Sequence, residues 1–160
     1  MARKRIGVVA AQIDENNQNL FLQGFLNEAF ASNFDVCIFS KYLKIQNNPA
    51  RELGDSNIYN LLDNCSLFDA IIILADTIQT PGIYESIEKK LHSLYKGPVL
   101  VVDKESSVFP YIMMDYYTSF KLLIDHLIDE HNYSNIVLLD GYQSHPHSIQ
   151  RLNAYKDSLL

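Results

Sequence analysis

Glycine is scarce in this chain, and its scarcity excludes several classes of enzyme. The 160 residues contain only six glycines, none close enough to another to build a GxGxxG fingerprint or a phosphate loop. None belongs to a GxSxG motif, which α/β-hydrolases place around their nucleophile. We therefore predict that the protein is not an enzyme and uses no cofactor.

Basic residues and long apolar runs are also few. The chain has 13 Lys and Arg against 19 Asp and Glu, with a formal charge of −6. This balance disfavours nucleic acid as a direct partner, so we expect contact with DNA only through a domain outside these residues. No run approaches the roughly 18 apolar residues that span a bilayer, and the N-terminus lacks a signal-peptide core. We expect no membrane partner and a cytoplasmic location.

The two cysteines point to a reduced, structural role. Cys37 lies in the apolar run VCIF, and Cys65 ends a helical pattern. Both patterns are typical of buried free thiols, although a disulfide between the two stays open. Neither cysteine has a local signature of a nucleophile.

Five short apolar runs rich in Val and Ile divide the chain. They cover residues 6–11, 36–39, 70–74, 99–102 and 136–139. Continuous apolar runs of this length are typical of parallel strands that are covered on both faces. Helical patterns separate them, so the sequence predicts a doubly wound parallel α/β sheet.

The helical patterns each predict one buried stripe. The stripes are Leu22, Phe25, Leu26, Ala29 and Phe30; Ile58, Leu61, Leu62 and Cys65; Ile83, Ile87, Leu91 and Leu94; and Phe120, Leu123, Ile124, Leu127 and Ile128. Thr80 and Pro81 are predicted as the N-cap and first residue of the third helix, and Gly97 as its end.

Ligands of open α/β sheets bind beyond the carboxyl ends of the strands. The loops predicted there span residues 12–18, 75–80, 103–114 and 141–148, and they carry acids, amides and histidines. These loops are the candidate ligand-binding segments.

Histidine pairs raise the possibility of a metal site. His126 and His131 lie five residues apart at a helix end, and His145 and His147 form an HPH loop. Neither arrangement has the ligand spacing of a structural zinc site, so we predict no metal.

A receiver-like phosphoacceptor is an alternative. Asp14 and Glu15 follow the first run, Asp76 follows the third, and Lys104 follows the fourth. Acids clustered in this way bind Mg²⁺ beside a phosphoacceptor. Against this reading, the chain continues with a further helix, strand and helix, and acids that cap helices give the same pattern.

An ordered set of segments resembles a known family. Asp103, the triplet MMD ending at Asp115, HLIDEH at 126–131, NIVLLDG and HPHSIQRLNAYKDSL follow one another with matching gaps. This order resembles the ligand-binding region of the Lac- and galactose-repressor family, whose fold is type 1 periplasmic-binding-protein-like. The segments RIGVVAAQ and LQGFLNEAFASNFDVCIF resemble the family's first strand and helix.

The resemblance implies a set of ligand-binding residues. Arg151 matches the family arginine that hydrogen-bonds the effector, and its planar fork suits hydroxyls, carboxylates or a base edge. The other candidates are His145, His147, Gln12, Asn17, Gln18 and Asp76.

The sequence departs from the family at several of these positions. Asn17 and Gln18 stand where aromatic residues are common, so a sugar ring would lose its stacking platform. Tyr116 replaces a usual asparagine, and Ala154 replaces a usual glycine. Asp103 and Asp115 fit structural roles, with Asp115 as a helix cap.

The resemblance also implies a domain organisation. Residues 1–103 match an N-terminal lobe that is complete or nearly so, residues 104–116 an inter-lobe crossover, and residues 117–160 a truncated C-terminal lobe. The family's helix-turn-helix has no counterpart here, so we expect a fragment of a longer protein. An incomplete lobe would expose a strand edge, which predicts a homodimer; sedimentation velocity tests this.

The resemblance implies the function as well. We expect a sensor that binds a small polar effector, sugar-like or otherwise, between two lobes, as part of a Lac-repressor-type transcriptional regulator. An alternative is the sensor of a signalling protein with a diguanylate cyclase or histidine kinase output, to which GDSNIYNLLDN is similar.

Overall fold

The computed structural model describes residues 3–42, 49–141 and 145–160. The chain divides into two compact units, Met1–Met113 and Met114–Leu160, called unit 1 and unit 2 below. No helix in the described part combines the length and apolarity that crossing a membrane requires.

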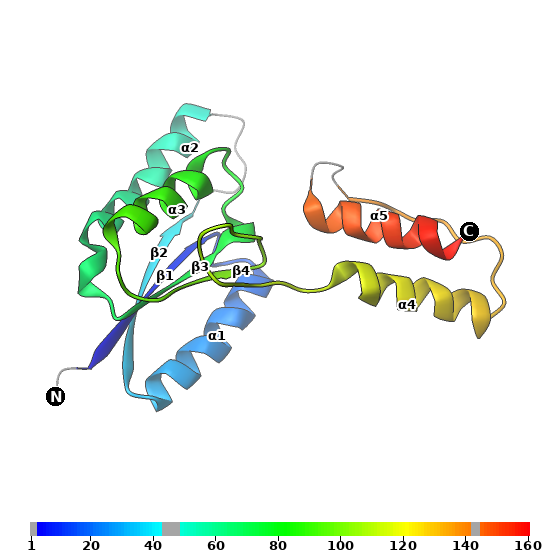
Figure 1. Ribbon diagram of the computed structural model, residues 1–160, viewed down its shortest axis with the longest axis horizontal. Helices are drawn as coiled ribbons and strands as arrows, with labels where there is room; N and C mark the ends of the chain where they lie inside the picture. Colours follow the sequence, from blue (N-terminus) through cyan, green and yellow to red (C-terminus); the bar gives the residue numbers. More distant parts are fainter. Residues whose placement is uncertain (1–2, 43–48, 142–144) are drawn as a thin grey trace. The chain divides into compact units, whose positions relative to one another are not determined.

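Unit 1 is built on a parallel sheet of five strands in the order β2-β1-β3-β4-β5 (Figure 1). The strands are β1 (Lys4–Ala11), β2 (Phe34–Lys41), β3 (Ala70–Leu74), β4 (Val99–Val102) and β5 (Tyr111–Ile112). The first four confirm the predicted runs, and with them the α/β class. The two-residue β5 falls where we expected only an irregular crossover, and it pairs with Val101 and Val102 of β4.

Helices cover both faces of this sheet. The helix α1 (Asn16–Ala31) lies on one face, and α2 (Pro49–Asp55), the 3-10 helix η1 (Ser56–Leu67) and α3 (Ile83–Leu94) lie on the other (Figure 1). Successive side chains of β1 alternate between the two cores: Val8 packs on the α1 side and Val9 on the η1 and α3 side. This alternation explains why each central strand reads as a continuous apolar run.

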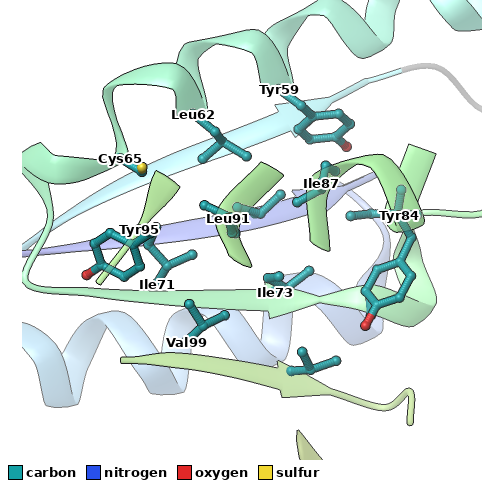
Figure 2. Packing of buried hydrophobic residues seen from close by; sticks show 14 of the residues in the cluster. Tyr59, Leu62, Cys65, Ile71, Ile73, Tyr84, Ile87, Leu91, Tyr95 and Val99 are labelled. Carbon is teal, nitrogen blue, oxygen red and sulfur yellow. The ribbon is translucent and has the colours of Figure 1, made fainter. Parts of the chain in front are cut away.

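The larger core lies between the sheet and the pair η1 and α3 (Figure 2). Along η1 the buried residues are Ser56, Tyr59, Leu62 and Cys65. Their spacing of three follows the three residues per turn of a 3-10 helix. The α-helical stripe predicted for this segment is therefore wrong at Leu61, which is 52% exposed, although Cys65 is buried as predicted.

Several other burial predictions are wrong at the margins of elements. Phe30, Leu94 and Leu123 are exposed although they continue apolar stripes. Cys37 is exposed as well, because β2 lies at an edge of the sheet and has a neighbouring strand on one side only. Both cysteines are free thiols.

The third helix begins later than its cap signals indicate. Its N-cap is Gly82, which has a φ of 78° and so adopts a left-handed conformation that glycine tolerates without strain. The Thr80 hydroxyl, predicted to cap the helix, instead accepts a hydrogen bond from the ammonium of Lys41.

Unit 2 consists of two helices that pack on each other, α4 (Tyr116–Asp129) and α5 (Pro146–Ser158). Asp115 is the N-cap of α4, where its carboxylate accepts a hydrogen bond of 2.9 Å from the amide of Thr118. This confirms the predicted cap.

The run at 136–139 is not a strand, which corrects the prediction. Val137 and Leu139 are 83% and 92% exposed. A parallel strand needs a neighbouring strand to accept its hydrogen bonds, and the described residues of unit 2 contain none.

Candidate functional site

A cluster of polar and aromatic side chains joins the starts of α4 and α5 in unit 2. The rings of Tyr116 and His147 are stacked, with centroids 4.2 Å apart and planes 29° apart. The guanidinium carbon of Arg151 lies 5.8 Å from the Tyr116 ring centroid, within the range of a cation–π contact. His145 meets His147 edge-on, with centroids 4.9 Å apart.

Local sequence signals create this cluster. The Asp115 cap starts α4 at Tyr116, and Pro146 occupies the first turn of α5, where its missing N–H costs no hydrogen bond. His147 and Arg151 are four residues apart in α5, so both project from the same face of the helix. The two helix starts thus supply the ring and the cation.

Close packing holds Arg151 in place. Its Nη2 donates a hydrogen bond of 3.3 Å to the hydroxyl of Ser148, a side chain that is 3% exposed. A Cβ added to Gly141 would lie 2.6 Å from that hydroxyl oxygen, so any other residue there would require the Ser148 side chain to shift. Of the five donors of a guanidinium, this bond uses one.

The structure brings together the three unit 2 residues that we predicted as ligand-binding, namely Arg151, His145 and His147. It adds Tyr116, which sequence reasoning noted only as a departure from the family pattern. The signal that would have found it is an aromatic residue directly after a helix cap, where its ring can stack on a neighbouring helix.

The carboxyl edge of the sheet in unit 1 holds two further candidates. Gln12 directly follows β1 with a φ of 54°. Its backbone N–H donates a hydrogen bond of 2.9 Å to the backbone carbonyl of Lys41. Asp76 is half-buried in the 3-10 turn η2 (Ala75–Thr77) that follows β3. Strands β1 and β3 are neighbours with connections that leave in opposite directions, which is the position where open α/β sheets bind ligands.

Asn17 and Gln18 lie elsewhere than expected. The structure places both in the first turn of α1 instead of in the preceding loop, with Asn17 exposed and Gln18 half-buried. Asn17 and Gln18 therefore belong to the helix, whereas Gln12 lies in the loop before it.

Two buried polar groups near this edge escaped sequence reasoning. Lys41, the last residue of β2, is 6% exposed, and its ammonium donates a hydrogen bond to the hydroxyl of Thr80. The hydroxyl of Tyr59 donates a hydrogen bond of 2.7 Å to the carbonyl of Ala10, and burial raises the pKa of Tyr59 to about 12. A lysine that ends an apolar strand was the available signal.

Lys104 is engaged with α3. Its ammonium lies 3.3 Å from the carboxylate of Glu85 and 4.0 Å from the centroid of the Tyr84 ring. Beside it, the hydroxyls of Tyr84 and Ser106 both donate to Glu88, at 2.8 and 2.6 Å. These contacts attach the loop after β4 to α3, and burial raises the pKa of Tyr84.

Comparisons with known proteins give structural matches only. No family model matches the sequence, and no curated protein matches it by sequence. Among solved structures, the chain resembles the periplasmic binding protein of the arabinose transporter from Shewanella sp. ANA-3, with a TM-score of 0.72 at 18% identity. That match covers 98% of this chain and 50% of the other.

Two transcriptional regulators match similarly. A LacI family regulator from Weissella paramesenteroides with bound glucose gives a TM-score of 0.70 at 17% identity, covering 98% of this chain and 53% of that one. The trehalose repressor from Escherichia coli gives 0.65 at 19% identity, covering 98% and 55%. The chain therefore spans about half the length of these structures. The protein has the type 1 periplasmic-binding-protein-like fold that LacI family regulators share with periplasmic sugar-binding proteins.

Proposed function

We propose that this chain is part of the effector-sensing domain of a bacterial transcriptional regulator of the Lac-repressor type, and that its effector is a sugar-like or other small polar molecule. The supporting observation is the cluster of Arg151, Tyr116, His147 and Ser148 in unit 2. The fold supports the same reading, since the solved structures that resemble it include a regulator with bound glucose.

The chemistry of the cluster suits such an effector. A guanidinium donates several hydrogen bonds in one plane, which matches the hydroxyl or carboxylate oxygens of a small polar molecule. The guanidinium lies over the Tyr116 ring, which itself stacks on His147, and it donates a hydrogen bond to Ser148. A donor fixed in this way loses less entropy when it binds a ligand than a free surface arginine does.

Sensing requires no covalent step. A ligand shifts a conformational equilibrium by the difference between its affinities for the two states. Lys104, which the phosphoacceptor alternative would use, pairs with Glu85 and lies over the Tyr84 ring.

A ligand screen tests the proposal. Thermal unfolding of the chain is measured with sugars, purines and amino acids in turn, and any compound that raises the midpoint is titrated by calorimetry. We expect Arg151→Ala to weaken binding by roughly tenfold or more, because hydrogen bonds to a charged group contribute about 1.5–3 kcal/mol.

The matched control is Arg3→Ala, which removes an arginine from the exposed pair with Asp35. Binding should survive this change. A small molecule that binds Arg151→Ala as tightly as the unchanged chain would contradict the role of Arg151. Gln12→Ala and Asp76→Asn test the unit 1 candidates separately.

A further inference from the structure

The spacing of His126 and His131 in the sequence predicted no metal, but the structure brings their rings together, and we propose that they form a binding site for a divalent first-row transition-metal ion at the C-terminal end of α4. Both side chains are exposed, and their Nε2 atoms lie 3.2 Å apart. The two ring planes are nearly perpendicular, at 85°, with centroids 4.9 Å apart. Neither residue belongs to the Arg151 cluster, so the site is separate from the proposed effector contacts.

The separation of the two nitrogens fits a shared metal ion. Zinc binds imidazole nitrogen at about 2.0–2.1 Å, so two nitrogens at tetrahedral angles around one ion lie roughly 3.3–3.4 Å apart. The observed 3.2 Å is close to this value.

The end of α4 explains how residues five positions apart meet. On a straight helix such residues face different directions. Here α4 ends at Asp129 and Asn132 adopts a positive φ of 54°. The backbone N–H of Asn132 donates a hydrogen bond of 3.0 Å to the carbonyl of Ile128. The backbone N–H of Tyr133 donates one of 3.1 Å to the carbonyl of Leu127.

These two hydrogen bonds fold the chain back over the last turn of the helix. The His131 ring also stacks on Tyr133, with centroids 5.6 Å apart and planes 16° apart. The pair is therefore positioned before any ion binds, which reduces the entropy cost of chelation.

The local charge favours a cation. The acids Asp129 and Glu130 lie between the two histidines, while the nearby Asp125 is already paired with Lys121. The C-terminal end of a helix also carries a partial negative charge from its unpaired carbonyls. Both effects raise the concentration of cations near the two imidazoles.

Imidazole ligands define the class of metal. Nitrogen donors of this type suit Zn²⁺, Ni²⁺ and Cu²⁺ and disfavour Mg²⁺ and Ca²⁺, which take oxygen ligands. Two protein ligands leave further coordination positions for water or another donor, as in exchangeable sites. The competing explanation for the same geometry is a simple hydrogen bond, in which one ring N–H donates to the other ring.

Calorimetric titration with Zn²⁺ at pH 7.5 separates the two explanations. We expect one ion per chain, and we expect His126→Gln and His131→Gln each to weaken binding by roughly tenfold or more, because each removes one arm of a chelate. His92→Gln, which removes an exposed histidine from α3, is the matched control and should bind as the unchanged chain does. Far-UV circular dichroism checks that each variant is folded.

Nuclear magnetic resonance locates the ion. Substoichiometric Ni²⁺ should broaden the amide signals of residues 126–133 first. If Zn²⁺ binding is absent, if it persists in the double variant H126Q/H131Q, or if broadening centres elsewhere, the pair is only a hydrogen bond and the proposal is wrong.

Discussion

The two units of the chain reach very different degrees of burial from similar apolar patterns. In unit 1 helices cover both faces of a sheet, and two cores form, one on each face. Among the described residues of unit 2, the buried hydrophobic side chains are Ile124 and Ala154. Two helices alone present one shared face to each other, so most of their apolar residues stay partly exposed.

The apolar runs of the two units show why. Residues 70–74 and 136–139 are both short and rich in branched side chains, yet only the first is a strand. Ile71 to Leu74 pair with β4 on one side, and β1 pairs on the other. An apolar run thus forms a strand only where neighbouring strands accept its backbone hydrogen bonds.

The largest pKa shifts lie in unit 1, where side chains are buried. In unit 1, burial raises the pKa of Tyr59 and of Tyr84. In unit 2, hydrogen bonds on exposed groups act instead: the amide of Thr118 lowers the pKa of Asp115, and the carboxylate of Asp157 raises that of Tyr117.

The largest effect should come from truncating a matched pair of leucines. Leu91 is fully buried in unit 1, and Leu139 is 92% exposed in unit 2. We expect Leu91→Ala to lower the free energy of unfolding by about 2–5 kcal/mol, because it leaves a cavity. Leu139→Ala should change it by less than about 0.5 kcal/mol. Urea unfolding followed by circular dichroism measures both, and equal losses would remove the contrast between the units.

An intermediate effect is expected from Tyr59 at alkaline pH. The folded pKa of about 12 lies above the ordinary 10.0, so the folded state keeps a proton that the unfolded state loses. The stabilisation is complete below pH 10 and is lost as pH rises from 10 to 12. The difference between the folded pKa of about 12 and the ordinary 10.0 corresponds to roughly 2–3 kcal/mol in the free energy of unfolding.

Urea unfolding at several alkaline pH values measures this loss. Tyr59→Phe should make the decline with pH shallower, with a remainder from Tyr84, whose pKa burial also raises. Tyr42→Phe changes an exposed tyrosine and is the control. If the decline is as steep in Tyr59→Phe as in the unchanged chain, burial of Tyr59 does not cause it.

The smallest effect is expected at Asp115. Its pKa is lowered from 3.8 by the hydrogen bond from Thr118, so the charged cap is present above that value and is lost as pH falls below it. The protection of the Thr118 amide against hydrogen exchange, relative to the intrinsic rate at each pH, should therefore fall only below about pH 3.8. Asp115→Asn should keep the cap but abolish this pH dependence. Titration of Asp115 at its ordinary value would show that the cap is weaker than the structure indicates.

Most of unit 1 could be predicted from the sequence. The runs at 70–74 and 99–102 match β3 and β4 without change, because central strands need apolar side chains on both faces. The 3-10 helix η1 could not be predicted from an expected α-helical period, although its buried residues repeat every third position. The exposure of Cys37 depends on which strand lies at the edge of the sheet, and strand order is a tertiary property.

The candidate site was predictable in part. A family resemblance indicated Arg151, His145 and His147, and the structure brings these together in unit 2. Tyr116 completes the cluster because α4 and α5 pack side by side, which no local pattern specifies. The ligand-binding roles of Gln12, Asn17, Gln18 and Asp76 stay predictions.

The sequence by itself determined the alternation of strands and helices in unit 1, the cap at Asp115 and the absence of nucleotide-binding motifs, because these depend on neighbouring residues and on side-chain chemistry. Only the tertiary structure decided that 136–139 stays unpaired, that Tyr116 stacks on His147 and that His126 meets His131. These outcomes depend on which segments pack or fold back on one another, and the free energy of that packing is shared among residues far apart in the chain.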